Sequence, residues 1–246
     1  VEKGLEGVCI TDHMDLDFPE TPDFPANAFQ FDLDEYFGQL NRLKEQYKGK
    51  LDLRIGVEIG LQKHLGEAYH RLTEAYPFDF VIGSVHLVGG QDPYYRKIFE
   101  GRTDEEVYRM AFRETLENVE AVKDFDTLGH LDYVVRYGIH QAAEYSYRKF
   151  SDEIDAVLKK LIAEGKGLEM NLAGIKYGLG FPNPHPDVLK RYRELGGEII
   201  TIGADAHEPA HVAYEFEKAT EILRECGFSY YAEFHGRKPV FQRIVP

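Results

Sequence analysis

Residues 199–207 read IITIGADAH, and this stretch decides the fold. Four apolar or β-branched residues lead into a glycine, and two metal-binding side chains, Asp205 and His207, follow directly. A short apolar run of this kind is typical of a strand buried in a parallel sheet. Alternate residues of an extended chain point the same way, so Asp205 and His207 should face one side. The stretch therefore predicts a buried strand that delivers two metal-binding groups at its carboxyl end.

The same arrangement recurs four times elsewhere in the chain. A short run precedes each of four further side chains: His13 after VCITD, Glu58 after IGV, His86 after FVIGSV and His130 after TLG. Together with the other apolar runs, the pattern predicts strands at residues 7–11, 54–58, 80–85, 127–130, 167–172, 198–203 and 229–234.

Segments with helical spacing separate these runs. Apolar residues predict a helix over residues 33–47, and Thr103 with Glu106 forms a capping box for the next one. Ser151 is predicted to cap a helix whose apolar face lies within 154–162. The stretch 210–226 is predicted to be a helix that stops at Gly227.

Strands that alternate with helices favour a parallel sheet, because parallel neighbours need crossover connections. The 246 residues suit one α/β domain that spans the whole chain, 1–246. Seven strands fit a βα barrel better than a small open sheet, and a doubly wound sheet is the alternative. The segments 18–25 and 173–186 follow strands, so in a barrel they would cover the active-site face.

Composition excludes several classes of function. The net charge of −14 disfavours nucleic-acid binding, which needs a basic face. No apolar run reaches transmembrane length, so we expect no membrane partner. Cys9 and Cys226 are the only cysteines, which indicates a reducing compartment and hence a cytoplasmic protein. The sequence does not indicate an oligomeric state.

The carboxyl ends of barrel strands meet at one rim. We therefore expect six side chains to surround one cleft: His13, Glu58, His86, His130, Asp205 and His207. One histidine at a strand end is more often structural than a ligand, but five such strand ends favour a metal site. Imidazole and carboxylate ligands suit Zn, Fe or Mn.

Five motifs in order carry a resemblance to a known family: ITDH at 10–13, GVEIG at 56–60, GSVH at 83–86, GHLD at 129–132 and GADAH at 203–207. They resemble those of the PHP (polymerase and histidinol phosphatase) family, and the part from Ala204 to Val240 looks like its histidinol-phosphate phosphatase branch. The resemblance implies a distorted (βα)7 barrel with up to three divalent metal ions, Zn, Mn or Fe.

The resemblance also implies a role for each ligand. On that model Glu58 bridges two metals and Asp205 shares the first with it. His86 and His130 complete the second, and His13 and His207 hold the third. The family's opening His-x-His motif has no counterpart here. We therefore expect the first βα element to be missing and the natural gene to encode roughly 20–30 further N-terminal residues.

Other residues are candidates for supporting roles. Arg136 is the candidate for phosphate binding, and Asn171 and Lys176 are candidates for lining the substrate pocket. Tyr177 could stack on an imidazole ring. Asp12 is expected to orient His13 from behind the metal ligands, and capping of the following loop is the alternative.

The function implied is a metal-dependent phosphomonoesterase of the histidinol-phosphatase type, in histidine biosynthesis. The metal cluster would draw in a small anionic phosphomonoester and activate a water molecule. The residues expected to carry this catalysis are Glu58, His86, Asp205 and His207. Three alternatives stay open: a PHP phosphoesterase for another small phosphate or nucleotide, an amidohydrolase-type metal hydrolase, and an inactive PHP-like module.

Overall fold

The computed structural model describes residues 1–245 and contains one main parallel sheet. Its strands are β1 Gly7–Ile10, β2 His13–Met14, β3 Asp52–Gly60, β4 Phe80–Ser84, β5 Thr127–Leu128, β6 Gly167–Asn171 and β7 Ile200–Gly203. A separate hairpin consists of β8 Tyr230–His235 and β9 Lys238–Arg243.

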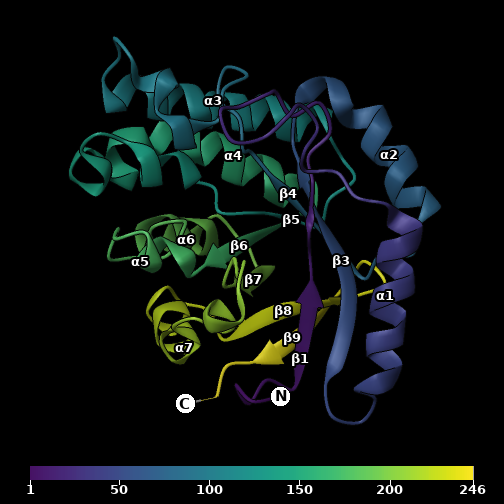
Figure 1. Cartoon of the computed structure of the whole chain (residues 1–246). Helices are drawn as coiled ribbons and strands as arrows, with labels where there is room; N and C mark the ends of the chain where they lie inside the picture. The colour runs from purple at the N-terminus through teal and green to yellow at the C-terminus, as the bar shows by residue number, and fades with distance from the viewer. Residues whose placement is uncertain (246) are drawn as a thin grey trace.

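Helices connect successive strands and lie around the outside of the sheet (Figure 1). The α-helices are α1 Leu33–Gln46, α2 Gly66–Ala75, α3 Asp104–Ala121, α4 Ser151–Ala163, α5 Ala173–Lys176, α6 Pro186–Glu194 and α7 Phe216–Glu225. Short 3₁₀ turns are η1 Lys63–Leu65, η2 Pro93–Tyr95, η3 Lys97–Phe99, η4 Tyr133–Tyr137, η5 Gln141–Glu144, η6 Tyr147–Phe150 and η7 Pro209–His211.

The strand order β1-β3-β4-β5-β6-β7 follows the chain, and every pair is parallel. The short β2 continues along β3 beyond β1, with His13 opposite Glu58. Because each crossover returns the chain to the same side, the carboxyl ends of these strands share one edge. The βα barrel architecture expected from the sequence is confirmed.

The core lies between the sheet and the helices. The apolar faces of α3 and α4 pack here, and Phe112, Val119, Ile154 and Leu158 have no exposed surface. Burial of each such side chain stabilises the fold by about 1.5–3 kcal/mol relative to exposure. Thr103 and Glu106 form the expected capping box at the start of α3. The core thus fixes the helices that hold the strand ends in place.

Two helix starts differ from expectation. Ser151 is the first helical residue of α4, and Phe150 precedes it without a side-chain cap, so the predicted Ser151 cap is wrong. The last helix begins at Phe216 rather than near residue 210. Ala213 and Glu215 both have left-handed backbone, with φ of 56° and 57°, which interrupts a helix. Its predicted end at Gly227 is confirmed by a φ of 88° there.

The seventh predicted strand does not join the parallel sheet. It forms β8, which pairs antiparallel with β9, a strand that the sequence pattern did not predict. The ring of Phe234 stacks on Phe80 at the start of β4, with ring centroids 4.8 Å apart. The turn of the hairpin reaches Asp79, whose carbonyl accepts the backbone N–H of Arg237. The hairpin therefore lies at the amino ends of the strands, away from the edge that carries the site (Figure 1).

None of the helices within the described residues combines the length and the apolar character needed to cross a bilayer.

Candidate metal centre at the carboxyl ends of the strands

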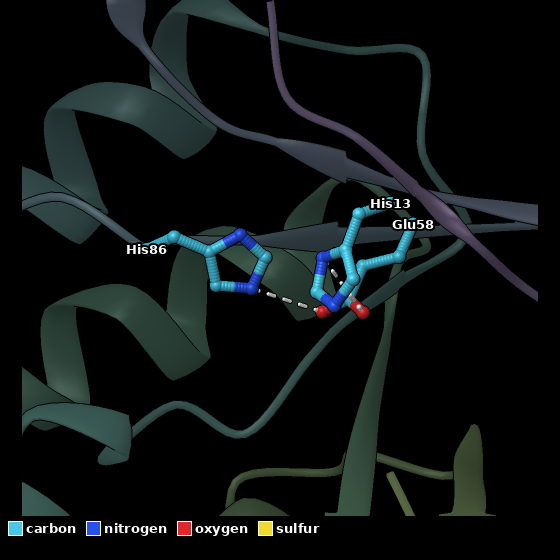
Figure 2. Close-up of side chains that lie close together, drawn as sticks. All are labelled: His13, Glu58 and His86. Atoms are coloured by element: carbon cyan, nitrogen blue, oxygen red, sulfur yellow. Dashed lines mark hydrogen bonds and ion pairs between the residues drawn. The ribbon is translucent and has the colours of Figure 1, made fainter. Parts of the chain in front are cut away.

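Glu58 is the centre of the site. It lies in β3, its side chain is buried, and three histidines surround its carboxylate. Glu58 Oε1 lies 3.2 Å from His86 Nε2 and 3.2 Å from His130 Nε2. Glu58 Oε2 lies 3.6 Å from His13 Nδ1, and Figure 2 shows His13 and His86 approaching the two oxygens. One carboxylate thus contacts the ends of three neighbouring strands.

The ends of β2 and β7 meet beside this carboxylate. His207 Nε2 lies 3.3 Å from His13 Nε2, and His207 Nδ1 lies 3.4 Å from Asp205 Oδ1. Asp205 has left-handed backbone with a φ of 48°, which is strained for a residue with a side chain and is typical of functional sites. The structure therefore brings all six predicted ligands together, and their roles as ligands stay predictions.

The spacing of these atoms fits a divalent cation. Two ligands bound at 2.0–2.2 Å to one tetrahedral ion lie roughly 3.3–3.6 Å apart, a range that follows from zinc–ligand geometry. The contacts of Glu58 with His13 and His86 fall near that range, and one ligand atom from each residue lies within 4.8 Å of the others. His13 Nδ1 is buried and makes no hydrogen bond. A nitrogen held against a carboxylate without a hydrogen bond is suited to binding a cation.

Asp15 is a functional candidate that the sequence reasoning missed. It is buried, and its Oδ2 lies 2.8 Å from His86 Nδ1. A carboxylate can only accept, so His86 Nδ1 donates to Asp15, and Nε2 is the ring nitrogen that faces Glu58 and would bind a metal ion. A histidine that gives one N–H to a carboxylate is typical of metal ligands. The signal was available, because Asp15 is two residues beyond His13 and alternate residues face the same way.

The orienting role predicted for Asp12 is wrong in its geometry. Within residues 1–245 its exposed carboxylate makes no hydrogen bond to His13. Only its backbone carbonyl meets the site region, where it accepts the backbone N–H of Glu58. Asp12 lies between β1 and β2, one residue before His13, so the alternation of an extended chain predicts that its side chain faces away from the side that His13 and Asp15 share.

The electrostatics of the site keep Glu58 ionised. Burial raises the pKa of Glu58, but the charge of His13 and hydrogen bonds from His130 and His86 hold that pKa well below its usual value. Burial lowers the pKa of His130 despite its contact with Glu58, which favours the neutral ring that binds metal. The site therefore pairs an ionised carboxylate with a neutral imidazole.

A second buried carboxyl group, Glu169, was also missed by the sequence reasoning. It lies in β6 under the site, and its Oε2 accepts the backbone N–H of His130. Burial and the charge of Glu58 raise the pKa of Glu169 to about 7. Its sequence context, an apolar run followed by Asn171, gave the same signal as the other strand ends.

Arg136 is buried in η4 beside Asp205. Its Nη1 donates to Asp205 Oδ2 at 2.9 Å, and its Nε donates to Asn183 Oδ1 at 2.8 Å. The rings of Tyr133 and Tyr177 lie 5.2 Å and 4.7 Å from the guanidinium carbon. Tyr177 thus contacts the guanidinium, and no imidazole stacking by Tyr177 is found within the described part of the chain. Burial raises the pKa of Asp205, but the positive charge of Arg136 lowers it. The pKa of Asp205 therefore lies below its usual value.

The two other substrate candidates lie at different depths. Lys176 lines an open pocket of about 490 Å³ with Tyr177, His207, Glu208 and His211. Asn171 is buried, and its amide bonds Glu169 and the backbone N–H of Ala173. In this structure Lys176 can meet a ligand directly, whereas Asn171 supports other groups, and substrate contact by either residue stays a prediction.

Comparison with known proteins gives one family and several relatives. Residues 1–173 match the model of the PHP domain. A probable histidinol-phosphatase of Clostridium acetobutylicum is 32% identical over 240 residues, which cover 98% of this chain and 86% of that protein. A histidinol-phosphatase of Lactococcus lactis is 31% identical over 249 residues, which cover 97% of this chain and 86% of that protein.

One solved structure agrees with the whole fold. It is histidinol phosphate phosphatase from Lactococcus lactis in complex with zinc, L-histidinol and phosphate. It superposes with a TM-score of 0.83 at 30% identity, covering 97% of this chain and 89% of that one. The similarity therefore extends over the sheet, the helices and the strand ends that carry the six residues.

Proposed function

Because this chain belongs to the PHP domain family, we propose that it is a histidinol-phosphatase, a metal-dependent hydrolase that converts L-histidinol phosphate to L-histidinol and phosphate. The observation that carries the proposal is the buried Glu58 carboxylate with three histidines around it. The relatives at about 30% identity, and the neighbour that holds zinc, L-histidinol and phosphate, support it.

Six residues would hold the metal ions on this proposal: His13, Glu58, His86, His130, Asp205 and His207. Zinc is the first metal to test, since the similar structure holds zinc, and up to three ions of Zn, Mn or Fe remain part of the proposal. Bound metal would supply a water of lowered pKa and positive charge toward the phosphate.

The chain's own residues would bind and orient the reactants. Asp15 holds the His86 ring through Nδ1, so the other ring nitrogen faces the centre of the site. Arg136 is buried beside Asp205 and against Tyr177, which lines the open pocket, and it would meet the phosphate oxygens through its remaining Nη hydrogens. Lys176, at the open pocket, would approach the substrate from the solvent side.

Two broader proposals follow from the same assignment. Residues 1–246 would act as a single phosphoesterase domain. A role in amino-acid biosynthesis would place the enzyme in the cytoplasm, and Cys9 and Cys226 are both free thiols, as expected in a reducing compartment.

The decisive assay compares substrates on one preparation. Zinc-loaded protein is given L-histidinol phosphate, a nucleoside monophosphate and 4-nitrophenyl phosphate, and phosphate release is followed. We expect kcat/KM for L-histidinol phosphate to exceed the other two by at least about 100-fold, on the order of 3 kcal/mol of discrimination. A preference for the nucleotide would refute the substrate and keep the hydrolase class.

A further inference from the structure

Four buried side chains form a continuous hydrogen-bonded chain behind the site, here called the Arg136 network: Asp132, Asn183, Arg136 and Asp205. Asn183 Nδ2 lies 2.5 Å from Asp132 Oδ1, and Asn183 Oδ1 accepts from Arg136 Nε at 2.8 Å. Arg136 Nη1 then donates to Asp205 Oδ2 at 2.9 Å. Asn183 and Asp132 have no exposed surface, and Arg136 is 3% exposed. The network therefore runs from the interior to a predicted metal ligand.

The orientation of the Asn183 amide is fixed by its two neighbours. Arginine can only donate, so the amide oxygen must face Arg136. The Asp132 carboxylate accepts, so the amide nitrogen must face Asp132. The other oxygen of Asp132 accepts the backbone N–H of His185 at 2.9 Å, which holds the carboxylate in place. Asn183 thus has one rotamer that satisfies both partners.

The backbone of Asn183 is held as firmly as its side chain. Its N–H and carbonyl exchange hydrogen bonds with Asn171 at the end of β6, at 2.8 Å and 2.7 Å. This pairing joins the 179–185 segment to a strand of the sheet. A side chain with fixed rotamer on fixed backbone is suited to positioning another group.

Arg136 depends on this arrangement because a buried guanidinium with an unpaired N–H is costly. Asn183 accepts a hydrogen bond from Arg136 Nε, and Asp205 accepts one from Nη1. Nη2 makes a longer contact of 3.5 Å with Asn171 Oδ1. On the proposed function, the remaining Nη hydrogens would bind the phosphate in a planar, forked geometry. The contacts of Nε with Asn183 and of Nη1 with Asp205 together set the plane of the guanidinium group.

We propose that Asn183, held by Asp132, is the positioning residue that sets Arg136 for the phosphate group of the substrate. This inference rests on the proposed function for the presence of a phosphate, and not on the identity of the alcohol that carries it. Asn183 acts through Arg136 and does not touch the substrate.

The test replaces the amide by an apolar group of similar size. Asn183→Leu removes both hydrogen bonds and excludes a bridging water, and Asn183→Ala is the milder second variant. Asn118→Leu is the matched control, because Asn118 is a buried amide in α3 that bonds the Leu61 carbonyl away from the site. Thermal melting reports on folding of all three variants.

Binding to the zinc-loaded protein separates positioning from general damage. Titration calorimetry measures the affinities for inorganic phosphate and for L-histidinol in separate experiments. We expect both Asn183 variants to lower the affinity for phosphate at least tenfold and to leave the affinity for L-histidinol unchanged. The kcat/KM for phosphomonoesters should fall about 100-fold, as for a misplaced catalytic contact. Asn118→Leu should leave the affinities for both ligands unchanged.

A double-mutant cycle tests whether Asn183 acts through Arg136. In an Arg136→Ala background, Asn183→Leu should have almost no further effect, within about twofold, because interacting residues are not additive. Full additivity, unchanged phosphate affinity in both Asn183 variants, or a wild-type protein that binds no phosphate would each overturn the proposal. Failure to hydrolyse L-histidinol phosphate with intact phosphate binding would refute only the proposed function.

Discussion

At the amino ends of the strands, the carboxylates of Asp126 and Glu233 are each paired with an arginine, whereas at the carboxyl ends Glu58 is surrounded by histidines. Asp126 Oδ2 accepts from Arg237 Nε at 2.6 Å, and Glu233 Oε2 accepts from Arg54 at 2.9 Å. Glutamate thus meets arginine in the hairpin beside the amino ends of the strands, and histidine at their carboxyl ends.

The partner determines what each end can do. Arginine is always charged and has no acceptor, so the arginines that pair with Asp126 and Glu233 offer no lone pair to a metal ion. Histidine can lose its proton and present a lone pair. At the histidine end, three buried atoms have no hydrogen-bond partner within residues 1–245: His13 Nδ1, His130 Nδ1 and Asp15 Oδ1. Buried polar atoms without a hydrogen-bond partner are rare, so three of them at one site indicate where a ligand binds.

The largest effect should come from exchanging glutamate for glutamine at each end. Glu58→Gln removes the charge that holds the cations, so we expect loss of metal and a fall in phosphatase rate of at least 100-fold, on the order of 3 kcal/mol of barrier. Metal content by mass spectrometry and kcat/KM measure the two effects.

Glu233→Gln is the matched control for that change, because it alters the same residue type at the arginine end. We expect its turnover and metal content to equal those of the wild type. Wild-type turnover with full metal content in Glu58→Gln would disprove a ligand role for Glu58.

The second prediction concerns stability with and without metal. A ligand that binds only the folded state at 100 times its Kd stabilises the fold by about 2.7 kcal/mol. Zinc should therefore raise the melting temperature of the wild type and of Glu233→Gln, and should not raise that of Glu58→Gln. A zinc-dependent shift of equal size in all three proteins would place the binding elsewhere.

The sequence predicted the histidine end better than the arginine end. Each residue of the site follows an apolar run, and parallel topology forces the ends of such runs to one edge. The pattern is local, so it could be read without a structure. Asp15 and Glu169 were missed because a single carboxylate near an apolar run is common, and only its burial distinguishes it.

The arginine end was not predictable in the same way. The run that became β8 has the composition of a parallel strand, and nothing local showed that it would fold back on residues 238–243. Most of β9 is exposed, so it lacks the alternation that marks a strand. Similarly, Asn183 is far from Arg136 in sequence, and only the tertiary fold brings them together.

The third prediction concerns removal of the ion pair between Arg237 and Asp126 at the arginine end. Arg237→Met removes the partner of the buried Asp126 and keeps the backbone N–H that bonds Asp79. Removing one partner of a buried pair costs 3–5 kcal/mol, and Arg237 is partly exposed, so we expect a loss of about 2 kcal/mol in the free energy of unfolding. Urea denaturation measures it, and kcat should stay at the wild-type value. A fall in kcat without a fall in stability would contradict the separation of the two ends.

The smallest expected effect is the pH dependence of the unfolding free energy that Arg237→Met loses. Burial raises the pKa of Asp126 above its usual value even though Arg237 lowers it. A carboxyl group with a raised folded-state pKa contributes its stability below the unfolded pKa of 3.8 and loses it as pH rises through the folded value. Without Arg237 that pKa rises further, and each added unit costs about 1.4 kcal/mol at neutral pH. The stability gap between wild type and Arg237→Met should therefore be narrow near pH 4 and widen toward pH 7. Adding Asp126→Asn to both proteins should remove the widening, and a gap that stays constant with pH would show that the arginine acts by packing alone.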